Sequence, residues 1–303
     1  MKVILIMVLP DAVILLRLGV VWLILRTAQR TCSLTNIKMK GNMIMGQEFF
    51  ERLFSLKGKT ALITGGYRGI GMAFAETYAE AGANVIITAR NLRGCQTAAQ
   101  ELSDKFGIKA AGSAMDVHDS KMVDHVVKDI VTEFGKIDIL VNCAGIPGNQ
   151  KPVIDMTDQD LDDVMNVDFR GTFIVSRAVA RCMITRNSGK IINVASIMGK
   201  ITTRKLAGYS ASKAAVIMLT RTMALELMRY NIQVNVLLPG YFLTPFNIDF
   251  FQTDTGKHLI KKMIPMNRLG DVMELKSTAL YLATCPTFLT GAEITVDGGH
   301  TIP

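Results

Sequence analysis

Beyond residue 57, short apolar runs alternate with longer stretches in which apolar positions recur at helical spacing. Short apolar runs are typical of strands buried on both faces, and the stretches between them are typical of the covering helices. The alternation therefore predicts βαβ units and a parallel sheet. Seven runs qualify as strands, namely residues 60–63, 84–88, 110–115, 137–141, 190–194, 233–238 and 293–296. We expect one α/β domain built on a doubly wound, seven-stranded parallel sheet.

Residues 1–46 differ in composition from the rest of the chain. Two apolar runs, residues 3–9 and 12–25, are interrupted by charges at Asp11 and Arg17. Each charge costs about 2.5–3.5 kcal/mol at the centre of a membrane, so the sequence predicts no clean span of about 20 residues. A membrane partner is therefore not expected unless this segment acts as an anchor.

Three interpretations of this segment remain open: a signal anchor, another targeting segment, or upstream translation that is not part of the working protein. Met43 and Met45 directly precede an amphipathic stretch at residues 46–56, which favours the last interpretation. We therefore divide the chain into an N-terminal extension, residues 1–46, and one folded domain, residues 47–303.

Composition excludes several classes of function. The 303 residues are 49% hydrophobic, which is ample for one large core, and the net charge is +8. No Lys/Arg cluster is interleaved with aromatic residues, so a nucleic-acid partner is not expected, whereas anionic small molecules are. The five cysteines are scattered and the four histidines lack ligand spacing, so neither disulfides nor a metal site is predicted. This cysteine usage favours a reducing compartment, the cytoplasm.

A glycine-rich turn follows the first predicted strand. Residues 64–71 read Thr-Gly-Gly-Tyr-Arg-Gly-Ile-Gly and lead into a predicted helix. Glycines in this position let the backbone approach a pyrophosphate at the helix N-terminus. Gly65, Gly69 and Gly71 have the spacing Gly-x-x-x-Gly-x-Gly, which differs from the Gly-x-Gly-x-x-Gly dinucleotide motif. A tight strand-to-helix connection without a ligand is the alternative.

A serine, a tyrosine and a lysine fall at a spacing that suits acid–base chemistry. Tyr209 and Lys213 are four apart on a predicted helix, residues 207–228, so both side chains project from one face. An adjacent ammonium can lower the pKa of a phenol from its usual value near about 10. Ser196 follows the strand at 190–194 and therefore lies at the carboxyl end of the sheet, where α/β folds bind their ligands.

Together these motifs resemble the short-chain dehydrogenase/reductase family over about residues 56–303. Further matches to the family are an Asp-Val pair, an Asn-x-Ala-Gly motif, a Pro-Gly pair followed by a threonine, and a Val-Asp-Gly-Gly motif; they stand at Asp116–Val117, Asn142–Gly145, Pro239–Gly240 with Thr244, and Val296–Gly299. The resemblance implies a Rossmann-type fold and an NAD(P)-dependent oxidoreductase that interconverts a carbonyl and a secondary alcohol. It also implies a homotetramer or a homodimer.

The resemblance further assigns roles to residues of this chain. Tyr209 would act as acid/base, Ser196 would orient the substrate oxygen, and Lys213 would hold the ribose and depress the pKa of the tyrosine. The cofactor-binding residues would be Gly65, Tyr67, Arg68, Gly69, Ile70, Gly71, Arg90, Asn91, Asp116, Val117, Asn142, Ala144, Gly145, Tyr209, Lys213, Pro239, Gly240 and Thr244. Of these, Asp116 and Val117 would flank the adenine, and Thr244 would meet the nicotinamide carboxamide. Cys143 replaces an asparagine common in the family.

The end of the second strand indicates the cofactor. NAD-specific dehydrogenases place an acidic residue there, about 20 positions after the glycines, to bind the ribose 2′-hydroxyl. This chain instead reads Thr-Ala-Arg-Asn at residues 88–91. Arg90, with Arg68 from the glycine turn, can pair a 2′-phosphate through charge-assisted hydrogen bonds. The sequence predicts NADP(H), with NAD(H) less favoured.

One position departs from the family. Its catalytic asparagine is located by the Gly-Thr-Phe stretch at residues 171–173, and that alignment falls on Asp168 rather than Asn166. Residues two apart on a helix face different directions, so Asn166 is not a simple substitute. We expect the Asp168 carboxylate to reach Lys213 through water, as the asparagine relay of the family does.

The substrate is indicated least clearly. Residues 221–227, 230–235 and 239–244 resemble gluconate 5-dehydrogenases and related sugar or polyol reductases most. A 3-oxoacyl carrier-protein reductase is the first alternative, and it would need a basic docking surface. A steroid reductase is another, because phenylalanines cluster at residues 242–251. From another class, a non-catalytic nucleotide-binding regulatory protein is opposed by the intact serine, tyrosine and lysine.

Overall fold

The computed structural model describes residues 5–9, 12–16, 48–245 and 247–302, and the chain divides into two units, Met1–Leu53 and Phe54–Pro303. In the first unit, β1 (Leu5–Leu9) pairs antiparallel with β2 (Ala12–Leu16). The predictions for residues 1–46 fall mainly outside the described residues and stay predictions. Within the described part of the chain, no helix has the length and apolar character needed to cross a membrane.

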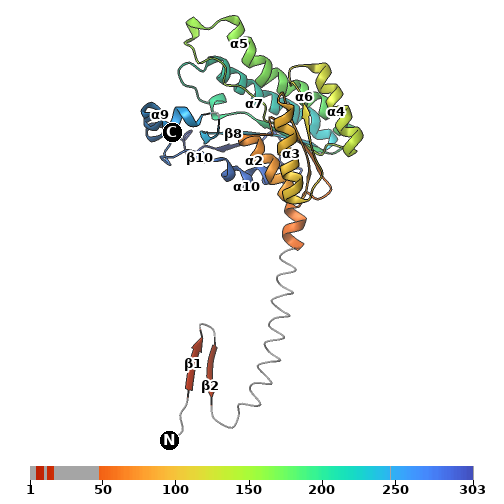
Figure 1. Cartoon of the computed structure of the whole chain (residues 1–303), viewed down its shortest axis with the longest axis vertical. Helices are drawn as coiled ribbons and strands as arrows, with labels where there is room; N and C mark the ends of the chain where they lie inside the picture. The colour runs from red at the N-terminus through yellow and green to blue at the C-terminus, as the bar shows by residue number, and fades with distance from the viewer. Residues whose placement is uncertain (1–4, 10–11, 17–47, 246, 303) are drawn as a thin grey trace. The chain divides into compact units, whose positions relative to one another are not determined.

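The second unit is organised around a central sheet (Figure 1). Seven parallel strands form it in the order β11-β8-β7-β6-β3-β4-β5. The strands are β3 (Thr60–Thr64), β4 (Asn84–Ala89), β5 (Ala110–Ala114), β6 (Ile139–Asn142), β7 (Gly189–Val194), β8 (Ile232–Pro239) and β11 (Glu293–Val296). All seven predicted strands are present, and their ends differ from the prediction by one or two residues at most. The doubly wound α/β fold is confirmed.

Helices cover both faces of this sheet (Figure 1). One face carries α2 (Gly69–Glu80), α3 (Leu92–Phe106) and α10 (Lys276–Thr284), and the other carries α4 (Ser120–Phe134), α6 (Thr172–Ile184) and α7 (Ala207–Leu227). Successive side chains of a strand point to opposite faces, and in inner strands such as β3 and β6 both faces are buried. Within β3, Ile63 packs into one core and Leu62 into the other. This is why the strands read as unbroken apolar runs.

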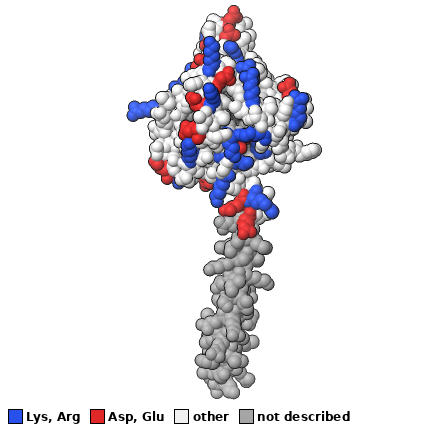
Figure 2. All heavy atoms as spheres, turned by 90° about the vertical axis from the view of Figure 1, so that its right-hand side faces the viewer, with Lys and Arg blue, Asp and Glu red and all other residues white. Residues whose placement is uncertain are grey.

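Shorter elements connect the helices and strands of these layers. They are η1 (Val153–Asp155), α5 (Asp158–Val164), the π-helical η2 (Met165–Gly171), η3 (Ile197–Gly199), η4 (Met228–Tyr230), β9 (Phe242–Leu243), α8 (Ile248–Gln252), α9 (Asp254–Met263), β10 (Gly270–Asp271) and η5 (Val272–Leu275). The face shown in Figure 2 carries Lys and Arg side chains interspersed with acidic and uncharged residues.

The chain order of the sheet reverses between β3 and β6, and a crevice forms at such a switch point. Thr64 ends β3, and its Oγ1 accepts hydrogen bonds from the backbone N–H groups of Cys143 and Ala144, at 3.0 and 3.1 Å. One hydroxyl thus fixes the position of the chain that leaves β6 relative to the end of β3. The residues expected to bind a ligand are therefore sought around this crevice.

Candidate active site

A cleft of about 810 Å³ opens at the carboxyl ends of the strands. It is lined by the segments that follow β3, β4, β5, β6, β7 and β8, together with residues of α7. Every residue that the sequence assigned to the site lies in this lining, with the exception of Asn142. Residues spread over more than 170 positions of the sequence, from Gly65 to Thr244, therefore share one cavity.

The glycine turn follows β3 and runs into the N-terminus of α2. Gly65 and Gly69 have φ values of +67° and +55°, in the left-handed region that favours glycine. A Cβ at Gly71 would stand 2.3 Å from the carbonyl oxygen of Gly65, so no larger residue fits there. The backbone segments at Gly65 and Gly71 therefore lie in close contact. Within the described residues, no side chain caps the N-terminus of α2, so its first N–H groups can bind an anion.

Asn142 lies behind the cleft and not in its lining. Its side chain is buried, and Nδ2 donates to the Ser176 hydroxyl and to Asn193 Oδ1, both at 2.8 Å. Asn193 in turn donates to the Thr220 hydroxyl at 2.8 Å. The network joins β6, β7, α6 and α7. The role that the resemblance gave to Asn142 in lining the crevice is replaced by one in holding its walls together.

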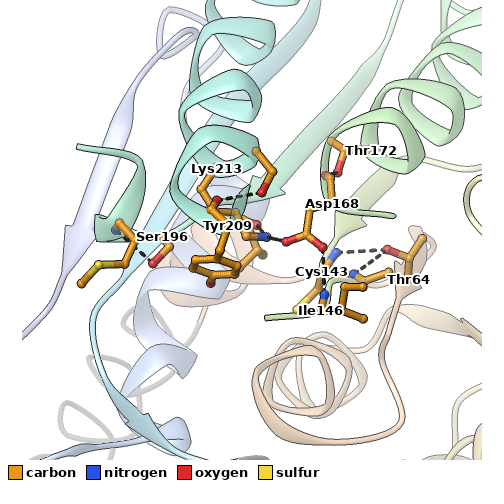
Figure 3. A network of polar contacts seen from close by, with 12 residues as sticks. Thr64, Cys143, Ile146, Asp168, Thr172, Ser196, Tyr209 and Lys213 are labelled. Carbon is orange, nitrogen blue, oxygen red and sulfur yellow. Dashed lines mark hydrogen bonds and ion pairs between the residues drawn. The ribbon is translucent and has the colours of Figure 1, made fainter. Parts of the chain in front are cut away.

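Ser196, Tyr209 and Lys213 reach the cleft from two adjacent elements (Figure 3). Ser196 follows β7 and begins η3, where its Oγ accepts a hydrogen bond from the Met198 N–H at 3.1 Å. Tyr209 and Lys213 lie one turn apart on α7, as the spacing predicted, and the lysine Nζ is 5.4 Å from the centroid of the tyrosine ring. Serine hydroxyl, phenol and ammonium thus share one wall.

Asp168 is in direct contact with Lys213. Its Oδ2 lies 3.0 Å from the lysine Nζ, and its Oδ1 accepts a hydrogen bond from the Ile146 N–H at 2.8 Å (Figure 3). Both partners are buried, with side chains 0% and 7% exposed. The predicted link through water is wrong, because carboxylate and ammonium form an ion pair. Gly145 provides the room, since a Cβ there would lie 3.3 Å from both groups.

The backbone around Asp168 has a feature that the sequence did not predict. Residues Met165–Gly171 form a π-helical segment between α5 and α6, and such segments are found often at functional sites. The Asp168 carbonyl accepts a hydrogen bond from the Thr172 hydroxyl at 2.7 Å. Of the two candidates for the relay position, the structure places Asp168 in the cleft lining, and Asn166 is not part of it.

The pKa values of Lys213, Cys143 and Tyr241 in the cleft are displaced, that of Tyr241 upwards by burial. Burial lowers the pKa of Lys213, but the Asp168 carboxylate, Tyr209 and Cys143 outweigh this effect, and the net pKa lies above the usual lysine value. Burial also raises the pKa of the Cys143 thiol to about 12, against a smaller lowering by Lys213. At neutral pH the cleft therefore contains a protonated lysine and a neutral thiol.

The other end of the cleft has basic and polar groups where β4 ends. Arg90 and Asn91 follow this strand, and Arg68 lies opposite in the glycine turn, 5.2 Å from the ring centroid of Tyr67. The Asn91 side chain caps α3 by accepting from the Gly94 N–H. No ion pair found among the described residues involves Arg68 or Arg90, and both side chains are exposed.

The connection after β8 forms the remaining wall and is largely aromatic. Phe242 and Phe251 are buried, and Phe250 is 46% exposed; all three line the cleft. Tyr241 stacks edge-on against Phe251 with ring centroids 5.4 Å apart. Phe246, which belongs to the predicted phenylalanine cluster, lies outside the described residues. Sequence reasoning missed Tyr241 and also Arg204, a cleft-lining cation between Ser196 and Tyr209 in the chain.

Comparisons with known proteins agree with this geometry. Residues 59–255 match the short chain dehydrogenase family. Gluconate 5-dehydrogenase of Gluconobacter oxydans is 38% identical over 251 residues, which are 82% of this chain and 97% of that protein. The 3-oxoacyl-(acyl-carrier-protein) reductase of Vibrio cholerae is 37% identical over 246 residues, 81% of this chain and 98% of that protein.

The solved structures include a gluconate 5-dehydrogenase from Burkholderia cenocepacia in complex with NADP and tartrate. It is 39% identical, with a TM-score of 0.79, and the match covers 83% of this chain and 98% of that one. The chain belongs to the short-chain dehydrogenase/reductase family. It is therefore an oxidoreductase that acts on CH–OH groups, in a family that uses NAD(H) or NADP(H).

Proposed function

We propose that this chain is an NADP(H)-dependent dehydrogenase/reductase that interconverts a ketone and a secondary alcohol on a sugar acid or a polyol. The observation that carries the proposal is the meeting of Ser196, Tyr209 and Lys213 in one cleft with a closed glycine turn at a helix N-terminus. A proton donor, an orienting hydroxyl and a cation are the groups that carbonyl reduction needs from the protein.

Each of these three residues has a defined task in the proposal. When bound, the nicotinamide cofactor supplies or accepts the hydride. The Tyr209 hydroxyl gives a proton to the substrate oxygen during reduction and takes one during oxidation. The Ser196 oxygen already accepts from the Met198 N–H, so its own O–H is free to donate to the substrate oxygen. The Lys213 ammonium has three donors; one is directed to Asp168 and one to the Val194 carbonyl at 3.5 Å, so one remains for a ribose hydroxyl.

The choice of NADP(H) rests on Arg90 and Arg68. Both line the cleft, Arg68 within the glycine turn and Arg90 after β4, and neither forms an ion pair with a described residue that would compete with a phosphate. The carboxyl end of β4 carries no carboxylate to bind a ribose 2′-hydroxyl. A doubly charged 2′-phosphate suits two guanidinium groups with free donors.

We expect the change Arg90→Ala to raise the Kd for NADPH by about 10–100-fold while the Kd for NADH changes little, because charge-assisted hydrogen bonds are lost with one cofactor only. Fluorescence titration of both cofactors measures this ratio. Arg229→Ala, which removes an exposed arginine that packs on Tyr230, is the matched control and should leave both values unchanged. Equal weakening of the two cofactors by Arg90→Ala would contradict the proposal.

The sugar-acid substrate is supported by similarity to gluconate 5-dehydrogenases, whose Burkholderia member binds tartrate. The acyl-carrier-protein reductase of Vibrio is almost as similar, so 3-oxoacyl thioesters are the second candidate. A screen of NADPH oxidation against 5-ketogluconate, ketoses, acetoacetyl thioesters and ketosteroids separates these classes. We expect the highest kcat/KM with 5-ketogluconate. A purely regulatory protein would bind NADPH and oxidise it with none of them.

We also propose that the enzyme works in the cytoplasm as a homotetramer or a homodimer. Its four described free cysteines and the family resemblance support this proposal. Light scattering of the purified chain measures the state of assembly, and a monomer at working concentration would contradict it.

A further inference from the structure

The loop between Ser196 and Tyr209 is tied at both ends to groups that we assign to the chemistry. It leaves Ser196 through η3 and returns at the first turn of α7. The hydroxyls of Thr202 and Ser210 lie 3.0 Å apart and join the loop to that turn. Thr203, Arg204 and Leu206 line the cleft. Side chains of this loop therefore line the same cleft as Ser196 and Tyr209.

Arg204 is the unpaired cation of this region. Among the described residues, four cationic side chains line the cleft: Arg68, Arg90, Arg204 and Lys213. Arg68 lies in the glycine turn, Arg90 follows β4, and Lys213 is paired with Asp168. No ion pair or hydrogen bond within the described part of the chain involves the guanidinium of Arg204. Its side chain is exposed and is therefore available to an anion that enters the cleft.

The backbone next to Arg204 adopts an unusual conformation. Lys205 has a φ of +68°, in the left-handed region that residues with a Cβ disfavour. The other non-glycine residues with positive φ among those described are all asparagines, which tolerate this region. Unfavourable backbone conformations persist where the surrounding structure requires them, and they cluster at ligand-binding sites. Here the residue with the unfavourable conformation, Lys205, directly follows Arg204, which lines the cleft.

We propose that Arg204 is a specificity-determining residue that binds the carboxylate of an anionic substrate while the substrate's carbonyl lies against Ser196 and Tyr209. A guanidinium matches a carboxylate with two parallel hydrogen bonds, and the fork fixes orientation as well as charge. The remaining walls, with Ile146, Met198 and the aromatic residues after β8, offer no second cation. The inference rests on the proposed function, because it takes the substrate to be a sugar acid.

The test compares two ketones that differ at one carbon. 5-Ketogluconate has a carboxylate at C1, and L-sorbose has the same carbon chain with a hydroxymethyl group in its place. We expect Arg204→Gln to raise KM for 5-ketogluconate by about 10–100-fold and to change KM for L-sorbose by less than about twofold, since only the first loses a charge-assisted pair. Arg204→Lys should restore part of the loss, because charge returns without the fork.

Lys205→Gln is the matched control. It removes one positive charge from the same turn, but Lys205 does not line the cleft. We expect its KM for 5-ketogluconate to stay within about twofold of the unchanged enzyme, because a screened surface charge contributes little. An equal loss with Lys205→Gln would mean that general attraction of anions explains the effect. Equal losses for both ketones with Arg204→Gln would also overturn the inference.

A binding measurement separates this inference from the proposed function. Calorimetric titration of the NADP-loaded enzyme with tartrate, a dicarboxylate, requires no turnover. If neither ketone is reduced but tartrate binds and Arg204→Gln abolishes that binding, the carboxylate site stands and the proposed substrate is wrong. If tartrate does not bind, or binds equally to Arg204→Gln, the inference is wrong whatever the enzyme reduces.

Discussion

Replacement of Tyr209 by Phe is expected to lower kcat by about 10²–10⁴-fold, the range that a positioned general acid contributes. The change removes one hydroxyl and leaves the ring against which Lys213 Nζ lies, 5.4 Å from the centroid. The ammonium and the glycine turn, which would hold the cofactor, are unaffected. The Kd for NADPH should therefore change by less than about threefold, or under about 1 kcal/mol.

The measurement is the initial rate of NADPH oxidation with the best ketone of the screen, together with a fluorescence titration of NADPH. Tyr281→Phe makes the same chemical change at an exposed position of α10, outside the cleft lining, and should retain full activity. If Tyr209→Phe kept more than a tenth of the activity, the phenol would not be the proton donor.

Replacement of Asp168 by Ala is expected to destabilise the fold by about 3–5 kcal/mol, because it leaves the buried Lys213 ammonium without its counter-charge. The Ile146 N–H also loses its acceptor. Asp168 raises the pKa of the lysine, so the pair's contribution is complete below the unfolded pKa near about 10.4 and is lost as pH rises through the folded pKa. Urea unfolding at pH 7 therefore measures the full effect.

Asp168→Asn separates charge from shape at the same position. The amide keeps an acceptor for the Ile146 N–H, so the variant should fold and retain activity near neutral pH. Without the carboxylate, burial lowers the pKa of Lys213, and the ammonium loses its proton at a lower pH than before. The alkaline limb of the kcat/KM profile should move to lower pH.

The competing assignment is tested with the neighbouring residue. Asn166→Ala should leave the pH profile in place, because Asn166 does not line the cleft. If Asn166→Ala abolished turnover while both the rate and the pH profile of Asp168→Asn stayed unchanged, the relay position would belong to Asn166 instead.

The fold could be predicted from the sequence because its strands are buried on both faces. In β3, the neighbours Leu62 and Ile63 pack into opposite cores. Because consecutive residues of such a strand are all buried, they are all apolar, and this run of apolar residues identifies the strand in the sequence. The pairing of Tyr209 with Lys213 was equally accessible. Both residues lie on one helix, where a spacing of four fixes the common face.

Contacts between separate elements were not accessible in this way. The ion pair of Asp168 with Lys213 depends on how the π-helical segment packs against α7, and no local pattern marks a π-helical turn. Asn142 illustrates the same limit. Its motif placed it at the crevice, but its hydrogen bonds go to Ser176 on α6 and Asn193 on β7, which only the packed sheet brings together. The spacing of residues in the sequence predicts which side chains are neighbours on one helix or strand. It does not predict which side chains of different elements are in contact.

Cys143 stands where the family commonly has an asparagine, within electrostatic range of the Lys213 ammonium. A nearby cation usually activates a cysteine, because the thiolate and not the thiol is the nucleophile. Here burial prevails and raises the pKa of the thiol to about 12. At neutral pH the sulfur beside Lys213 therefore stays a protonated thiol, the form of cysteine that is a poor nucleophile.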